Sequence, residues 1–299
     1  MTEKQTRCGF CAIIGVPNAG KSTLVNALAG TKIAIVSHKV QTTRSRLRAI
    51  VIAGDSQIIF VDTPGIFKPM RRLDEAMVEG AWSGASEADS VVLLADVRRG
   101  LSDEVMTIIE GLKKSRIKAF LALNKIDLVK ADTLLELSQK FNEVFPFRET
   151  FMISALNGSG VDKLKDTVAA LMPEGPWLYA EDQIADVPLR FLAAETTREK
   201  LYERLHEELP YASTVETETW EERKDGSVRI DQVIYVERES QRKIVLGKSG
   251  QTIKALGQAA RLDLEKAFDR RVHLFLFVKV RENWTKDPER LRMMMGLLG

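Results

Sequence analysis

A glycine-rich loop near the amino terminus carries the clearest chemistry in the sequence. Residues 15–22 read Gly-Val-Pro-Asn-Ala-Gly-Lys-Ser and match the pattern G-x-x-x-x-G-K-[ST]. Glycines at these positions let backbone N–H groups approach phosphate oxygens, and the helix that follows adds the positive end of its dipole. The loop therefore predicts a phosphate site in which Lys21 reaches the β- and γ-phosphates and the Ser22 hydroxyl binds Mg²⁺.

Three later segments supply what such a site still needs. In Asp62-Thr-Pro-Gly65 the aspartate can hold Mg²⁺ through water, and the glycine N–H can contact the γ-phosphate. In Asn124-Lys125-Ile126-Asp127 the Asp127 carboxylate can accept both the N1–H and the exocyclic amine of guanine, a donor pair that adenine lacks. Ser154-Ala155 suits a backbone contact to the guanine O6. Each segment alone could be an ordinary turn or helix start, but their order and spacing together favour a guanine-nucleotide site. The residues expected to contact the nucleotide or its Mg²⁺ are Gly15, Pro17, Asn18, Ala19, Gly20, Lys21, Ser22, Thr23, Asp62, Thr63, Gly65, Asn124, Lys125, Asp127, Ser154 and Ala155.

The elements that must position these residues alternate along residues 1–172. Short apolar runs predict strands at residues 10–16, 47–53, 57–61, 90–95, 119–123 and 150–153. Amphipathic stretches predict helices at residues 21–29, 102–114, 133–145 and 161–171. The alternation predicts an α/β domain with a mostly parallel sheet, apart from one antiparallel hairpin between residues 47–53 and 57–61. Such sheets bind ligands at the carboxyl ends of their strands, where the four segments lie.

These segments resemble the GTP-binding domain of the translation-factor-related GTPases, and the resemblance covers residues 9–172. It implies that Gln-Thr-Thr-Arg at residues 41–44 forms switch I, where one threonine completes the Mg²⁺ shell in the GTP state. The pattern favours Thr43, and spacing alone leaves Thr42 open. The loop at residues 66–72 would be switch II. The expected catalytic set is Lys21, Thr43, Gly65 and Asn18, and the expected metal ligands are Ser22, Thr43 and Asp62.

One position departs from the pattern of Ras-like GTPases. Where they carry the glutamine that orients the attacking water, this chain has Ile66, which cannot do so. Hydrolysis should therefore be slow by itself and accelerated by something else. In similar GTPases with a hydrophobic residue there, the asparagine that matches Asn18 helps hold a K⁺ ion in place of an arginine finger. The resemblance thus implies K⁺ beside GTP or GDP and Mg²⁺.

A second domain follows at residues 188–299. Residues 173–187 contain two prolines, a glycine, four acids and no base, and we interpret them as a linker. The first predicted helix begins the domain and ends at Pro210. Two strands joined through Asp225-Gly226, a short helix, a turn, a longer helix and a final strand complete an α-β-β-α-α-β order.

The turn between the last two helices is the informative part of this domain. It reads Gly247-Lys-Ser-Gly250, and a second phosphate loop is excluded because Arg242 stands where the first glycine of that motif belongs. The turn and the element order resemble a type II KH domain, whose glycines let a nucleic-acid backbone come close. The expected RNA contacts are Gly247, Lys248, Ser249, Gly250 and Lys254, with Ile244, Val245 and Ile253 lining an apolar groove for bases.

The charge balance supports a nucleic-acid partner once it is divided by segment. The 299 residues carry 44 bases and 42 acids, a net charge of +2 that, taken as a total, argues against a nucleic-acid partner. Residues 238–281, however, have 11 bases and 4 acids, whereas residues 188–237 have 7 bases and 12 acids. The sign reverses where the Gly-x-x-Gly segment begins, as an RNA-binding surface requires.

Other classes fit the sequence less well. No apolar run approaches the length of a transmembrane helix, and no signal-peptide core follows the amino terminus, so we expect a cytoplasmic protein. The Cys8-x-x-Cys11 pair has no partner set for zinc, and we interpret both as small buried hydrophobes in a strand.

Over nearly the whole chain, both motif sets together resemble the Era family of bacterial GTPases. The resemblance implies a monomeric switch that binds the 3′ end of small-subunit ribosomal RNA during subunit assembly. It also implies peripheral contact with the inner membrane. Three alternatives are an RNA-binding protein with a purely structural nucleotide domain, a membrane-trafficking GTPase and a phosphate-loop kinase. The kinase is disfavoured because Asn-Lys-x-Asp has no purpose in it, and the trafficking GTPase because lipidation signals are missing.

Overall fold

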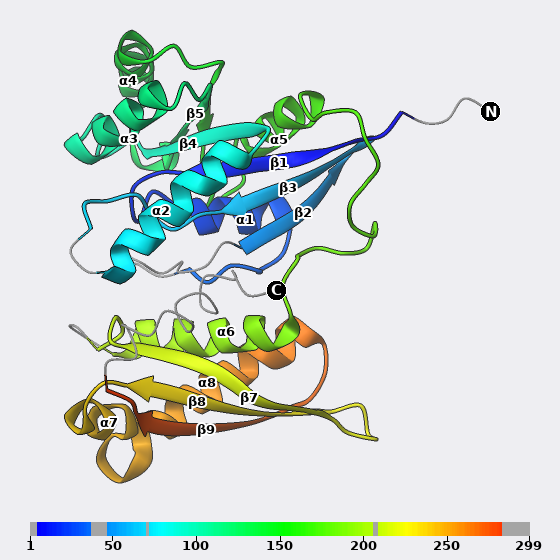
Figure 1. Cartoon of the computed structure of the whole chain (residues 1–299), viewed down its shortest axis with the longest axis vertical. Helices are drawn as coiled ribbons and strands as arrows, with labels where there is room; N and C mark the ends of the chain where they lie inside the picture. Colours follow the sequence, from blue (N-terminus) through cyan, green and yellow to red (C-terminus); the bar gives the residue numbers. More distant parts are fainter. Residues whose placement is uncertain (1–4, 37–46, 70–71, 206–208, 283–299) are drawn as a thin grey trace. The chain divides into compact units, whose positions relative to one another are not determined.

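In the computed structural model, which describes residues 5–36, 47–69, 72–205 and 209–282, the first six strands form one sheet in the order β2-β3-β1-β4-β5-β6 (Figure 1). β2 pairs with β3 antiparallel, and every other pairing in this sheet is parallel, as the sequence predicts. The strands are β1 (Arg7–Ile14), β2 (Leu47–Ala53), β3 (Ser56–Asp62), β4 (Ser90–Asp96), β5 (Phe120–Asn124) and β6 (Thr150–Ile153).

The helices of this unit cover both faces of the sheet, so its central strands are largely buried. α1 and α5 contact each other on one face, while α2 crosses the opposite face in contact with β1 (Figure 1). β3 and β4 are buried along their whole length, which explains the apolar runs inside them, residues 58–61 and 91–95. The helices are α1 (Lys21–Ala29), α2 (Arg72–Glu87), α3 (Asp103–Lys114), α4 (Ala131–Val144) and α5 (Val161–Ala170).

Helix α2 is the main element that the sequence pattern does not predict. Its buried apolar side chains, Met77, Ala81 and Ala85, form a single narrow row at four-residue spacing. Gly80 and Gly84 lower the intrinsic helix propensity between them. Packing against the sheet therefore stabilises this helix more than its own sequence does.

The segment that we interpret as a linker packs along the first unit. The chain divides into one unit formed mainly by Met1–Ala34 and Thr43–Asp186 and another formed mainly by Val187–Met293. At its start, the N–H of Gly175 donates to Thr6 O at 3.0 Å. Near its end, the N–H of Ile50 in β2 donates to Ile184 O at 2.8 Å. Residues 174–186 thus extend the first unit along the hairpin β2–β3.

The buried side chain of Gln57 holds the middle of this segment. Its Oε1 accepts from the N–H groups of Leu178 and Tyr179 at 2.9 and 3.0 Å, and its Nε2 donates to Tyr179 O at 2.9 Å. One amide thereby satisfies three backbone groups of a segment that has no strand partner at that point.

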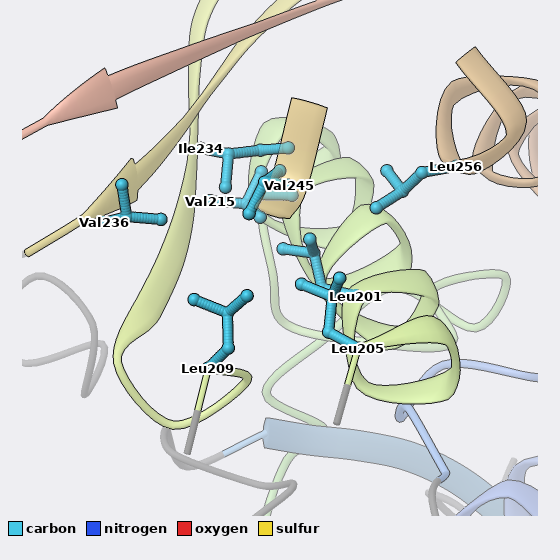
Figure 2. Close-up of a cluster of buried hydrophobic side chains, with 9 residues drawn as sticks. Leu201, Leu205, Leu209, Val215, Ile234, Val236, Val245 and Leu256 are labelled. Carbon is cyan, nitrogen blue, oxygen red and sulfur yellow. The ribbon is translucent and has the colours of Figure 1, made fainter. Parts of the chain in front are cut away.

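The second unit contains a three-stranded sheet, β7-β8-β9, with β7 antiparallel and β9 parallel to the central strand β8. Side chains from α6, α7, α8 and the sheet form its core, including Leu201, Val215, Ile234, Val245 and Leu256 (Figure 2). The elements are α6 (Leu189–Arg204), β7 (Ser213–Glu222), β8 (Val228–Val236), α7 (Glu239–Leu246), α8 (Gln251–Phe268) and β9 (Val272–Val280).

Two predicted boundaries in the chain are wrong for physical reasons. α6 ends at Arg204 rather than at Pro210, because Leu205 adopts an extended backbone. Leu209 joins the same core from beyond the helix, so its apolar character reflects burial rather than helical period. In the first unit, β1 ends at Ile14 rather than at residue 16, because the phosphate loop begins at Gly15.

The hydrogen bonds of Gln57 make a stability prediction. Replacing this residue by leucine, Gln57→Leu, should lower the free energy of unfolding in urea by about 1–3 kcal/mol, because three backbone groups are left without partners. Chymotryptic cleavage beside Tyr179 should also become faster. The control is Gln139→Leu on the exposed face of α4, and equal unfolding midpoints for the two variants would contradict the assignment.

Candidate functional site

The phosphate loop has a backbone that only glycine fits at two positions. Gly15 has φ 156°, and a Cβ there would collide with the carbonyl of Leu94 in β4. Gly20 has φ 102°, in the left-handed region, and a Cβ there would collide with the side-chain amide of Asn124. α1 begins immediately afterwards, so its first N–H groups point into the loop.

Lys21 lies inside this loop with its ammonium group held close to the backbone. Its Nζ donates to the carbonyls of Gly15 and Val16 at 3.1 and 3.0 Å, and the residue is 6% exposed. Burial lowers the pKa of Lys21 to about 8, against the opposing effect of the Asp62 carboxylate. The ammonium is therefore positioned at the centre of the loop, where an anion would stabilise its charge.

The two predicted metal ligands of the described residues lie side by side. The Ser22 hydroxyl donates to Asp62 Oδ2 at 2.8 Å, and Asp62 is fully buried at the end of β3. A hydroxyl and a carboxylate beside a phosphate loop fit Mg²⁺, which takes hard oxygen ligands and retains several waters. Thr63 is directed elsewhere, since its hydroxyl donates to Ile13 O at 2.7 Å and ties this loop to β1.

Gly65 brings the next loop against the phosphate loop. A Cβ on it would meet Pro17 Cγ at 2.8 Å, and the N–H of Ile66 donates to Gly15 O at 3.1 Å. Ile66 is itself 4% exposed, so its side chain packs in the interior. This burial agrees with the inference that residue 66 does not orient a water molecule.

Asn124 connects the three loops that make up the two halves of the site. Its Nδ2 donates to Ala19 O in the phosphate loop at 2.8 Å, and its Oδ1 accepts from the Ala155 N–H at 2.9 Å. The residue is 1% exposed at the end of β5. In the Ser154-Ala155 segment, which we expect to make a backbone contact to the guanine O6, the Ala155 N–H thus binds Asn124, and residues 154–155 are fixed relative to the phosphate loop.

Lys125 links the same loops at the outer edge of the site. One of its partners is Asp96, which belongs to none of the sequence motifs. Its Nζ donates to Asn18 O at 2.7 Å and to Asp96 Oδ2 at 2.6 Å. Burial would raise the pKa of Asp96, but hydrogen bonds from Arg98 and Lys125 outweigh it and lower that pKa to about 2. Asp96 ends β4, as Asp62 and Asn124 end their strands, and that position is the signal that could have identified it.

Asp127 is the predicted guanine contact, and its carboxylate faces solvent. It lies in the short 3-10 helix η1 (Ile126–Leu128) directly after the left-handed Lys125. Within the described ranges no residue donates a hydrogen bond to this carboxylate, so both oxygens are available for a planar pair of donors. Leu156, 82% exposed, follows the Ser154-Ala155 loop at the same carboxyl end of the parallel strands β5 and β6.

The predicted switch I residues Thr42 and Thr43 lie outside the described residues. The chain that enters this segment is held by Asn26 of α1, a residue that no motif marks. Its Oδ1 accepts from the N–H groups of Ile33 and Ala34 at 2.9 and 2.8 Å, and its Nδ2 donates to Ala34 O at 2.8 Å. A helical residue thus fixes the chain at Ile33 and Ala34, shortly before the described range ends at residue 36.

The Gly-x-x-Gly loop of the second unit has the backbone that its glycines suggest. Gly247 and Gly250 have φ 73° and 75°, and Ser249 between them has φ 52°. A Cβ on Gly247 would collide with Thr252, whereas the space at Gly250 is open. The 3-10 turn η2 (Lys248–Gly250) leads straight into α8, so the helix N-terminus adds positive character to the loop.

The predicted RNA contacts around this loop divide into exposed and buried residues. Lys248, Ser249 and Lys254 are exposed, and Ile244 is 57% exposed. Ile253 is partly buried against the core, and Val245 is fully buried within it (Figure 2). Val245 is therefore a core residue and not part of an open groove.

The structure also bears on three features outside both sites: the two cysteines, membrane-spanning helices and clusters of metal-binding side chains. Cys8 and Cys11 are buried free thiols in β1, and burial raises the pKa of both, which keeps them protonated and unreactive. No described helix is both long enough and apolar enough to cross a bilayer. Within the described part of the chain, no three His, Cys, Asp or Glu residues form a cluster suited to a metal ion.

Comparison with known proteins identifies both halves of the chain. A family model described as "50S ribosome-binding GTPase" matches residues 10–125, and a KH-domain model matches residues 208–285. GTPase Era of Brucella suis biovar 1 is 63% identical over 290 residues, which cover 97% of this chain and 93% of that protein. GTPase Era of Rhizobium meliloti is 61% identical over 97% of this chain and 92% of that protein.

Two solved structures resemble the whole chain. A variant of Aquifex aeolicus Era bound to GDP·AlF4⁻ superposes with a TM-score of 0.92 at 37% identity, covering 98% of this chain and 99% of that one. A structure of Era in complex with MgGDPNP and nucleotides 1506–1542 of 16S ribosomal RNA has a TM-score of 0.91 at 37% identity, with the same coverage. The predicted architecture, a phosphate-loop GTPase domain followed by a KH domain, is confirmed.

The ion pair between Asp96 and Lys125 predicts a pH dependence. Because the folded-state pKa of Asp96 lies below its ordinary value, its contribution to stability is present above about pH 4 and is lost as pH falls toward 2. The difference in unfolding free energy between wild type and Asp96→Asn should therefore be constant at neutral pH and shrink below about pH 4. Urea titrations from pH 7 to pH 2.5 measure it, and a difference that does not change with pH would contradict the assignment.

Proposed function

The chain belongs to the GTPase Era family, and from this premise we propose that it is a GTP-controlled switch that binds the 3′ end of small-subunit ribosomal RNA through its KH unit and assists assembly of that subunit. The observation that carries the proposal is the occurrence, in one chain, of a braced guanine-nucleotide site and a left-handed Gly-x-x-Gly loop in a basic segment. The Era complex with 16S nucleotides supports the choice of RNA.

Hydrolysis in this proposal depends on position and charge. Lys21 places an ammonium group at the centre of the phosphate loop, and Gly65 places an N–H at the end of β3 where the γ-phosphate would lie. Mg²⁺, held by Ser22 and Asp62, would neutralise charge on the phosphates when bound. Since Ile66 is buried and apolar, the chain has no glutamine at this point to orient water. GTP turnover should therefore be slow without an additional activator.

Asn18 is the residue to which we assign potassium activation. It adopts the left-handed φ of 62° at the exposed tip of the phosphate loop, where Lys125 fixes its carbonyl. Steady-state GTP hydrolysis should be faster in K⁺ than in Na⁺ at equal ionic strength, and Asn18→Ala should remove the difference. Equal rates in both salts would contradict this role.

Guanine selection rests on Asp127. Replacing its carboxylate by an amide, Asp127→Asn, should shift preference from guanine to xanthine nucleotides by at least tenfold, because the amide donates where the carboxylate accepts. Competition between labelled GDP and XDP measures this preference. If the variant retained RNA-dependent function in cells without XTP, the nucleotide domain would be merely structural and the switch would be contradicted.

RNA binding by the Gly-x-x-Gly loop can be tested with matched glycines. Gly250 and Gly226 both have positive φ, and a Cβ at either position would meet no atom closer than Ile253 Cγ2, at 4.0 Å from residue 250, so aspartate is strained to a similar degree at both. Gly250→Asp should weaken binding of an RNA of nucleotides 1506–1542 by at least tenfold, because it adds a negative charge where phosphates approach. Gly226→Asp, in the hairpin between β7 and β8, should bind like wild type. Equal affinities for the two variants would contradict the assignment.

Two finer parts of the proposal rest on the family resemblance. We propose that the chain acts as a monomer and contacts the inner membrane peripherally from the cytoplasmic side. Sedimentation equilibrium tests the first part, and a dimer at micromolar concentration would contradict it. Flotation with vesicles of inner-membrane lipids tests the second, and absence from the floated fraction would contradict it.

A further inference from the structure

Five basic side chains gather at one end of the first unit, away from the nucleotide site. Lys113 and Lys114 end α3, Arg116 and Lys118 follow in the loop to β5, and Arg148 precedes β6. All five are exposed, and residues 111–118 contain no acid. We refer to these five residues as the basic cluster.

The loop after α3 has a defined turn with an unusual residue at its critical position. The Ile117 N–H donates to Leu112 O at 3.0 Å, and the Arg116 N–H donates to Lys113 O at 3.1 Å, the pattern of a Schellman motif. Arg116 takes the left-handed position, with φ 54°, where glycine is the usual residue. An arginine there costs some stability relative to glycine, so the folding of this turn does not account for the residue.

Arg148 adds the fifth charge from a different element. Its N–H donates to Ala119 O at 2.9 Å, and its guanidinium lies 5.9 Å from the centre of the Phe120 ring. These interactions fix Arg148 beside the start of β5, next to the loop that carries Arg116 and Lys118. The basic cluster is thus one surface built from two segments.

Interactions within the chain do not explain this cluster. In the ranges that the structure describes, none of its five members forms an ion pair, whereas Arg99, Lys140, Lys163 and Lys165 of the same unit are paired with acids. The negative end of the α3 dipole favours Lys113 and Lys114, but its effect falls off within the last turn. Arg116, Lys118 and Arg148 lie beyond that turn.

The position of the cluster leaves the nucleotide site free. It lies at the amino-terminal end of β5, whereas Asn124 and the other nucleotide residues lie at the carboxyl ends of the strands. The five residues of β5 separate the two ends by roughly 13 Å. A large anion bound at the cluster would therefore not compete with GTP or GDP.

We propose that the basic cluster is a second binding surface for ribosomal RNA, which holds the phosphate backbone independently of the Gly-x-x-Gly loop. This inference rests on the proposed RNA-binding function. Five cations on one surface, without acidic partners among the described residues, suit a polyanion such as RNA. When they neutralise its phosphates, the counterions bound to the RNA are released, and this release favours binding. Stable binding to a membrane surface usually combines bases with inserted apolar side chains or a lipid anchor. None of the described residues 111–120 and 145–149 is a large exposed hydrophobic.

The test compares two four-residue variants of the full chain. In the cluster variant, Lys113, Lys114, Lys118 and Arg148 are changed to glutamine. In the control variant, the ion-paired Arg99, Lys140, Lys163 and Lys165 are changed to glutamine. Affinity is measured over a range of salt concentrations for the complete small-subunit ribosomal RNA and for the RNA of nucleotides 1506–1542.

The cluster variant should bind the complete RNA at least tenfold more weakly than the control. For the cluster variant, the slope of log K plotted against the logarithm of salt concentration should be smaller in magnitude by about 0.7–0.9 for each phosphate that the variant no longer neutralises. Both variants should bind the short RNA like wild type. Arg116→Gly alone should weaken binding to the complete RNA without lowering the unfolding midpoint, because glycine relieves the left-handed backbone.

Equal affinity and equal salt dependence of the two variants for the complete RNA would overturn the inference. It would also be overturned if the cluster variant were impaired only in binding to vesicles of phosphatidylglycerol and phosphatidylethanolamine. Failure of the wild-type chain to bind the short RNA would instead contradict the proposed function of the KH unit, so the two failures are distinguishable.

Discussion

The candidate nucleotide site depends on one buried amide, that of Asn124. It joins the phosphate loop to the Ser154-Ala155 loop through two hydrogen bonds, and it excludes any side chain at residue 20. Leaving either partner unsatisfied in this buried position would cost about 1–3 kcal/mol. The phosphate-binding and guanine-binding parts of the site are therefore held in a fixed position relative to each other. Lys125 makes a second connection at the outer edge of the site, because its ammonium group binds both the phosphate loop and Asp96.

In the second unit, buried groups also fix the position of the binding loop, but the backbone conformation of the loop contributes more than side-chain hydrogen bonds do. Its Gly-x-x-Gly loop is set by backbone conformation, because Gly247 lies too close to Thr252 for any Cβ. The core and two linked hydrogen bonds, from Thr197 to the buried Gln232 and from Gln232 to Thr217, hold α6 against the sheet. The charge that would attract RNA is carried by exposed residues such as Lys248 and Lys254. In the proposed RNA site, buried groups thus set the shape of the loop, and exposed residues supply the affinity for RNA.

Most of this architecture could be predicted from sequence because its determinants are local. The buried strands β3 and β4 each contain an uninterrupted apolar run, and the phosphate loop, the Asn-Lys-x-Asp segment and the Gly-x-x-Gly turn are contiguous motifs. What could not be predicted depends on interactions between distant segments. α2 is stabilised by the sheet, and Gln57 acts on residues more than a hundred positions away.

The functional residues that the motifs do not mark follow the same rule. Asp96 stands in no motif, and its role appears only when the sheet brings it beside Lys125. Asn26 acts on Ile33 and Ala34 through a turn that has no sequence signature. The apolar neighbours of Val245 predict a place in the groove, but side-chain direction on the short helix α7 places it in the core. Single-residue orientation and long-range pairing are therefore the information that the linear pattern lacks.

Control of the RNA site by the nucleotide, within one chain, is the property on which the proposed switch rests. It is measured as the affinity of the wild-type protein for the RNA of nucleotides 1506–1542, at fixed salt, with a non-hydrolysable GTP analogue and Mg²⁺ or with GDP and Mg²⁺. A nucleotide-controlled RNA site predicts affinities that differ by at least fivefold and, by thermodynamic reciprocity, the same factor in nucleotide affinity when RNA is bound. Identical RNA affinities in the two nucleotide states would contradict it.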